Sequence, residues 1–122
     1  MRKNLLLPLI LLILTGCTAG DSYSTFTIDN SSSLNIAIEY YQLSNGDTAQ
    51  LVIVPNNSEQ IWEVTAKGRN TNWYYDYGVS INHIVNANGD TLIVNPNIAS
   101  NWVMYNAGTD SYYHLPVSDA SF

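Results

Sequence analysis

The sequence predicts an all-β protein, an antiparallel two-sheet Ig-like sandwich of about seven to nine short strands. Beyond residue 22 apolar side chains alternate with period two, as in Leu34, Ile36, Ile38 and Tyr40, which is typical of half-buried antiparallel strands. Turn-forming residues interrupt the chain about every 8–12 positions, and no stretch has the i, i+3, i+4 apolar spacing of a helix. A small β-barrel is the alternative.

The expected strands are separated by turn chemistry. Asn45-Gly46 and Asn88-Gly89 are the dipeptides of two-residue type I′ hairpins, because both central positions of such a turn need positive φ. Pro55 and Pro96 end two further strands. The expected strands cover residues 23–28, 34–43, 48–54, 58–65, 73–77, 79–85, 91–94, 102–106 and 111–117.

The first sixteen residues predict a removable export leader. Arg2 and Lys3 give a positive start, and the apolar run from Leu5 to Leu14 is about half of the roughly 20 residues that a membrane-spanning helix needs. We therefore expect residues 1–16 to be a signal peptide, 17–22 a short flexible tether, and 23–122 the folded domain.

The end of the leader, Leu14-Thr15-Gly16-Cys17, resembles the lipobox of bacterial lipoproteins. That resemblance implies cleavage after Gly16, a diacylglycerol thioether on Cys17 and acylation of the new amine. It also implies a cell-envelope protein held in the outer membrane, since Thr18 replaces the aspartate that retains lipoproteins at the inner membrane. Cys17 is the sole cysteine, so no internal disulfide can form, and two or three acyl chains anchor a protein stably.

The rest of the chain resembles the small Ig-like sandwich lipoproteins of Bacteroidota. The shared features are an early strand before an Asn-Ser turn, a late Trp102 and a tyrosine-rich final strand. The resemblance implies a sandwich and carries no catalytic residues across.

Charge excludes one class of partner. Asp and Glu number ten against four Lys and Arg, and the formal net charge is −6. Removal of the leader leaves Lys67 and Arg69 as the only cations. A nucleic-acid-binding protein needs a basic surface that replaces phosphate counterions, so we expect no nucleic-acid partner.

No motif predicts catalysis, a metal or a cofactor. The chain lacks a G-x-S-x-G elbow, and its two mature histidines, His83 and His114, have no zinc spacing. His83 falls on the same strand face as Ile81 and Val85, which predicts a position in the core or at its rim. The acidic residues near turns form no calcium-loop motif, so we expect no enzyme.

The aromatic residues are mostly amphipathic: nine Tyr and three Trp against two Phe. Tyr and Trp are favoured at binding surfaces. They are densest in Trp73-Tyr74-Tyr75-Asp76-Tyr77, where Trp73, Tyr75 and Tyr77 would share one strand face. These three residues are the predicted binding surface, with burial between the two sheets as the alternative.

The expected function is a non-enzymatic protein-binding or structural module of the cell envelope. The alternatives are a carbohydrate-binding module that stacks Tyr and Trp on sugar rings, and a small envelope enzyme or inhibitor. Coplanar exposed aromatics would favour the glycan, and a flat apolar patch with a free sheet edge would favour a protein. A deep cleft lined by His83 or His114 would favour an enzyme.

Overall fold

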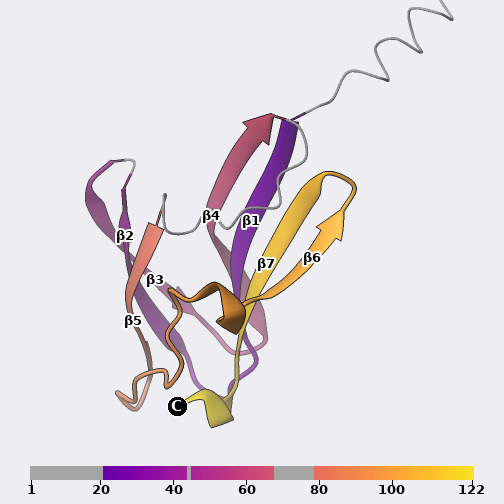
Figure 1. The fold of residues 1–122 in the computed structure, drawn as a ribbon. Coiled ribbons are helices and arrows are strands. Elements are labelled where there is room, and N and C mark those ends of the chain that lie inside the picture. The colour runs from indigo at the N-terminus through magenta and orange to yellow at the C-terminus, as the bar shows by residue number, and fades with distance from the viewer. Residues whose placement is uncertain (1–20, 44, 68–78) are drawn as a thin grey trace, which may run out of the picture.

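The computed structural model describes residues 21–43, 45–67 and 79–122. They form two facing sheets (Figure 1), a four-stranded sheet in the order β4-β1-β7-β6 and a three-stranded sheet in the order β3-β2-β5. The predicted two-sheet sandwich is confirmed, and the sheets do not close into a barrel. The elements are β1 (Asp21–Asn30), β2 (Ile36–Gln42), β3 (Asp47–Ile53), β4 (Asn57–Lys67), β5 (Val79–Asn86), η1 (Ala99–Asn101), β6 (Val103–Ala107), β7 (Asp110–Val117) and η2 (Asp119–Ser121).

The prediction of a strand at 91–94 is wrong, and the strand predicted at 73–77 cannot be compared with the structure. In segment 91–94 only Thr91 pairs, through a single bridge to Val85. The Ile93 N–H instead donates to the Ser121 carbonyl at 2.8 Å, because here the chain leaves the three-stranded sheet on its way to β6 in the other sheet. The expected strand 73–77 lies outside the described residues.

One strand pairing departs from the antiparallel expectation. β1 and β7 run parallel, in register from Ser24 opposite Ser111 to Asn30 opposite Val117, while the other four pairings are antiparallel. Alternation along a strand fixes which side chains face inward but says nothing of the direction of its neighbour.

Both predicted hairpin dipeptides lie in turns, but neither forms a type I′ turn. Gly46 and Gly89 have φ of 71° and 85°, whereas Asn88 does not have positive φ. Four residues connect β2 to β3, and the Asn45 Oδ1 accepts a hydrogen bond from the Asp47 N–H at 3.0 Å. In the second turn the Asn86 Oδ1 accepts hydrogen bonds from the Asn88 and Asp90 N–H groups, both at 3.0 Å. The side chains of Asn45 and Asn86 therefore stabilise these two turns.

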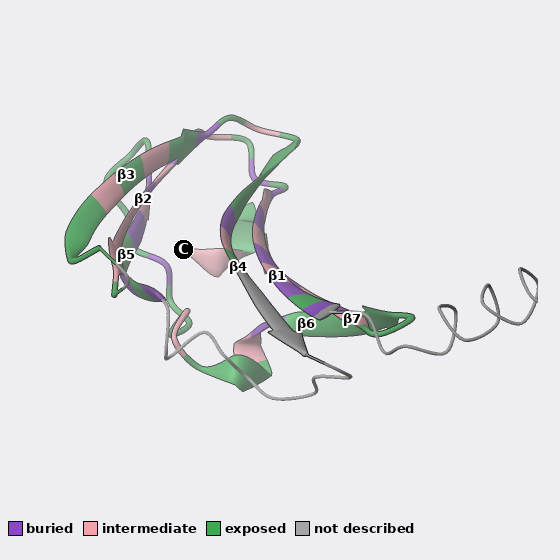
Figure 2. Ribbon diagram, turned by 90° about the horizontal axis from the view of Figure 1, so that it is seen from above, coloured by how far each residue is buried: buried purple, intermediate pink, exposed green. Residues whose placement is uncertain are grey.

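The core lies between the facing surfaces of the two sheets, where Figure 2 shows the buried residues. The Phe26 ring contacts two other aromatic rings in the core. It stacks on Tyr113 with centroids 4.7 Å apart and packs edge-on against Trp102 with centroids 5.8 Å apart. The Trp102 Nε1–H donates to the Pro96 carbonyl at 2.7 Å, which satisfies its one polar group. Isoleucines dominate the remaining buried apolar set: Ile28, Ile36, Ile38, Ile53, Ile61, Val79, Ile81, Ile84, Leu92, Leu115 and Val117.

A β-bulge in β5 reverses the predicted side of His83. Glu39 lies opposite His83 but Tyr40 lies opposite Ile81, so Asn82 is an extra residue. Ile81 and Ile84 therefore both face the core, and His83 is exposed. The expectation that His83 shares the core face of Ile81 is wrong, because one inserted residue moves every later side chain to the opposite face.

The buried Asn30 side chain connects the two sheets. Its Nδ2 donates to the Ile53 carbonyl on β3 and to the Leu34 carbonyl before β2, both at 2.9 Å. Its Oδ1 accepts from the Ser32 N–H at 3.0 Å and from the Ser32 hydroxyl at 2.6 Å. The β1–β2 crossover is thereby held to the end of β3 with the amide fully satisfied.

The chain end is held near the same crossover. The Ser33 N–H and hydroxyl both donate to the Asp119 Oδ1 at 2.9 Å. These two hydrogen bonds favour the carboxylate and lower the pKa of Asp119 below its ordinary value.

Replacement of Asn30 should strongly destabilise the domain. We expect Asn30→Ala to lower the free energy of unfolding by about 2–4 kcal/mol, because it removes the Asn30 partner of the buried Ile53 carbonyl and of the buried Ser32 N–H. The Leu34 carbonyl keeps the Ser32 hydroxyl as a donor. Denaturant unfolding followed by circular dichroism measures the change. The exposed Asn35 is the control, and Asn35→Ala should cost less than about 0.5 kcal/mol. Equal losses for the two variants would contradict the role given to Asn30.

Candidate functional site

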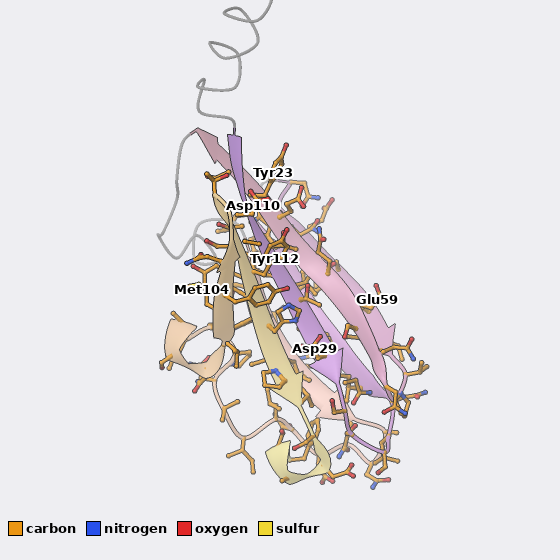
Figure 3. All side chains as sticks on the ribbon, turned by 90° about the vertical axis from the view of Figure 1, so that its right-hand side faces the viewer. Tyr23, Asp29, Glu59, Met104, Asp110 and Tyr112 are labelled. Atoms are coloured by element: carbon orange, nitrogen blue, oxygen red, sulfur yellow. The ribbon has the colours of Figure 1, made fainter. Side chains whose placement is uncertain are left out.

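The predicted binding residues Trp73, Tyr75 and Tyr77, and the predicted lipidation residue Cys17, lie outside the described residues. The structure brings together a different set on the outer face of the four-stranded sheet. Figure 3 looks onto this face. We call it the β6–β7 face and define it by Tyr105 on β6, Tyr112 and His114 on β7, Asp29 on β1 and Ser58 on β4.

Three rings form a ladder across β6 and β7. Tyr105 stacks on Tyr112, which is its direct partner across the strands, with centroids 5.0 Å apart and planes 16° apart. The same Tyr105 ring stacks on His114 at 5.6 Å and 15°. Tyr105 thus covers two rings of β7 while half of its own surface stays exposed (51%). Such cross-strand aromatic pairs stabilise the ribbon that carries them.

A polar network borders the ladder. The His114 Nδ1 lies 2.9 Å from the Asp29 Oδ2, and the Ser58 hydroxyl donates to the Asp29 Oδ1 at 2.6 Å. The side chains of His114 and Asp29 are 31% and 28% exposed, so the pair contributes about 0–1 kcal/mol to stability. Its main effect is to orient the imidazole, with Nδ1 held by the carboxylate.

These three polar residues do not have the order of a catalytic triad. In a triad the serine hydroxyl bonds to the imidazole, and the carboxylate holds the other ring nitrogen. Here Ser58 bonds to the carboxylate itself. The arrangement orients side chains on a surface and does not activate the Ser58 hydroxyl.

Among the described side chains of this sheet, β6 is the strand on which every residue is exposed. All five residues of β6 are exposed (Figure 2), including Val103 at 58% and Met104 at 45%. Among the described residues β6 pairs only with β7. No backbone group from the described part of the chain pairs with the second edge of the strand, which also carries apolar side chains.

The other sheet edges carry features that prevent further pairing. Asn97 covers the edge of β5: its Nδ2 donates to the Ile81 carbonyl at 2.9 Å, and its Oδ1 accepts from the Ile81 N–H at 2.8 Å. β4 carries the exposed Glu59 and Glu63, and β3 begins with the exposed Asp47. Charges and covering groups of this kind discourage strand addition, and β6 has no charge, no proline and no bulge.

The residues of this face could not be identified from the sequence, for two separate reasons. The uncharged run Val103–Ala107 was visible as a strand, but nothing in the sequence marks it as the edge. Asp29 and His114 are 85 residues apart and meet only because β1 and β7 pair in parallel.

Within 21–43, 45–67 and 79–122 no three His, Cys, Asp or Glu side chains gather as a metal site would require. In the same ranges no helix has the length and apolar character to cross a bilayer.

The chain was also compared with known proteins. No family model, no curated protein and no solved structure matches it.

The ring ladder should be measurable as coupling between Tyr105 and Tyr112. In a double-mutant cycle with alanine at each position we expect a coupling free energy of about 0.5–1.5 kcal/mol, from denaturant unfolding of the four proteins. The matched control pairs Tyr105→Ala with Val52→Ala in the other sheet, and these two changes should add within about 0.3–0.5 kcal/mol. Coupling no larger than that of the control would contradict the stacking role.

Proposed function

We propose that this protein is a lipid-anchored lipoprotein of the bacterial cell envelope that binds a protein partner, without catalysis, through the β6 edge. The observation that carries the proposal is the β6 strand itself. It combines a backbone edge that has no partner within 21–43, 45–67 and 79–122 with the exposed side chains of Val103, Met104 and Tyr105 and no charge. A partner segment can add to such an edge as a further strand.

The side chains of β6 suit a protein interface. Adding a strand satisfies the backbone groups of β6, and burial of apolar side chains contributes about 25 cal/mol per Å². Tyrosine is enriched among the residues that contribute most to binding. Tyr105 is already held by Tyr112 and His114, so its ordering costs little further entropy on association.

The geometry favours a protein over a glycan. A sugar ring stacks on an open aromatic face, and a platform for several sugars needs coplanar exposed rings. The rings of Tyr105, Tyr112 and His114 instead stack on one another, so much of their π surface is already occupied. The hydrogen bond from Ser58 to Asp29 differs from the order of a Ser-His-Asp triad, so these residues give no support to a serine hydrolase.

The anchor rests on the lipobox. Cys17 is the sole cysteine and closes the sequence Leu14-Thr15-Gly16-Cys17. We expect intact-mass analysis of membrane-extracted protein to show loss of residues 1–16 and at least two acyl chains on Cys17, since one chain holds a protein only marginally. Cys17→Ser should block both events. A soluble protein with an unmodified Cys17 thiol would contradict the proposal.

The β6 edge can be tested in the cell with a photo-reactive amino acid. We place it at Val103, and at Val52 on the other sheet as a matched control, because both valines are 58% exposed. We expect a discrete protein adduct from position 103 and none from position 52. Tyr105→Lys should remove the adduct, since charge on an edge strand opposes pairing. Equal labelling from both positions, or none from position 103, would contradict the proposal.

A further inference from the structure

We propose that Asn88 is a site of spontaneous covalent modification, where its carboxamide is converted to aspartate and isoaspartate without an enzyme. The nucleophile is the backbone nitrogen of Gly89, and the leaving group is ammonia. The site lies in the turn that follows β5, so the inference does not depend on the binding role of the β6 edge.

The reaction takes place between two neighbouring residues and water. The Gly89 nitrogen loses its proton to solvent and attacks the Asn88 Cγ, which forms a new C–N bond and a five-membered succinimide ring. The bond between Cγ and Nδ2 breaks, and Nδ2 takes a proton from solvent and leaves as ammonia. Water then opens the ring at either carbonyl, which gives aspartate or isoaspartate. A glycine after the asparagine favours the attack, because no side chain shields its nitrogen.

The chain contains the same dipeptide twice, in the same local sequence. Residues 45–48 and 88–91 both read Asn-Gly-Asp-Thr. In each turn the glycine N–H donates to the carbonyl of the last residue of the preceding strand, Gln42 of β2 or Asn86 of β5, at 2.9 Å. The tetrapeptide and the state of the nucleophile therefore do not distinguish the two sites. A difference in rate must come from the surroundings of the two asparagine side chains.

The Asn45 carboxamide is held at both ends. Its Nδ2 donates to the Gln42 Oε1 at 2.8 Å, and its Oδ1 accepts from the Asp47 N–H at 3.0 Å. The side chain must turn away from both partners before its Cγ can approach the Gly46 nitrogen. These two hydrogen bonds therefore slow the reaction at Asn45.

The Asn88 carboxamide is exposed and makes no hydrogen bond within 21–43, 45–67 and 79–122. The neighbouring Asn86 side chain stabilises this turn instead, by accepting from the Asn88 and Asp90 N–H groups. A methyl group on the Gly89 Cα would have no described residue within 4 Å, so solvent has access to the nitrogen that must lose its proton. The Asn88 side chain is thus free to rotate toward Gly89.

The isoaspartate product would alter the end of the three-stranded sheet. It lengthens the backbone between Asn86 and Asp90 by one methylene. The Asn86 N–H donates to the Asp90 carbonyl at 2.9 Å, and its Oδ1 accepts from the Asp90 N–H at 3.0 Å. Asn86 is buried and lies opposite Ile36 of β2. The longer backbone displaces Asp90 from both hydrogen bonds, whereas aspartate leaves the length of the backbone unchanged.

The two sites can be compared within one protein. Full-length protein is incubated in mildly alkaline buffer, both folded and unfolded in urea, and peptide mapping by mass spectrometry follows the conversion of amide to acid at positions 45 and 88. In the folded protein we expect conversion about tenfold faster at Asn88, because two hydrogen bonds hold Asn45. In urea the two identical tetrapeptides should react at similar rates. Equal rates in the folded protein, or faster conversion at Asn45, would overturn the inference.

Gln42→Ala tests the cause of the difference. It removes the acceptor of the Asn45 Nδ2 hydrogen bond, so conversion at Asn45 should become faster while the rate at Asn88 stays unchanged. Circular dichroism shows that the variant is folded. An unchanged rate at Asn45 would contradict the protective role of the hydrogen bonds.

Melting temperatures test the consequence for the sheet. Protein enriched in isoaspartate at position 88 by incubation should melt at a lower temperature than fresh protein. Asn88→Asp, which adds the same charge without the extra methylene, is the matched control and should melt close to the unchanged protein. Equal melting temperatures for the isoaspartate form and Asn88→Asp would contradict the effect assigned to the longer backbone.

Discussion

The four hydrogen bonds of the Asn30 side chain join the last residue of β1 to the crossover that enters β2 and to the last residue of β3. The amide donates through Nδ2 and accepts through Oδ1, and both kinds of hydrogen bond require a narrow range of angles. These bonds therefore fix the position of one sheet relative to the other. The inward side chains of both sheets can interdigitate only at that one offset. The burial of Ile28 on one sheet and of Ile36 and Ile53 on the other depends on it.

The four sheet edges differ in a way that relates the fold to its proposed use. Three edges carry charges or the Asn97 side chain, which keep other strands away. The β6 edge carries neither, and its exposed Tyr105 is fixed by stacking. An unprotected apolar edge is an aggregation hazard for a free protein, so its retention in an otherwise protected sandwich supports a role in specific association.

Alternation and turn residues sufficed to predict most of the fold, because both are local. They locate β1 to β7 to within a few residues, apart from segment 91–94, which follows the path between sheets rather than its own propensity. The bulge at Asn82 depends on the partner strand, and therefore His83 was placed on the wrong face. The β6–β7 face could not be predicted from the sequence, because Asp29 and His114 meet only through the pairing of β1 with β7.

The parallel pairing of β1 with β7 has a consequence for how the chain folds. β7 is the last strand and lies between β1, the first, and β6, so the four-stranded sheet combines the two most distant parts of the sequence. Loop closure over such a distance costs entropy before any contact compensates for it. The β6–β7 hairpin can form early, but β1 keeps one edge open until Asp110–Val117 has been synthesised. We therefore expect the pairing of β1 with β7 to follow formation of the β6–β7 hairpin.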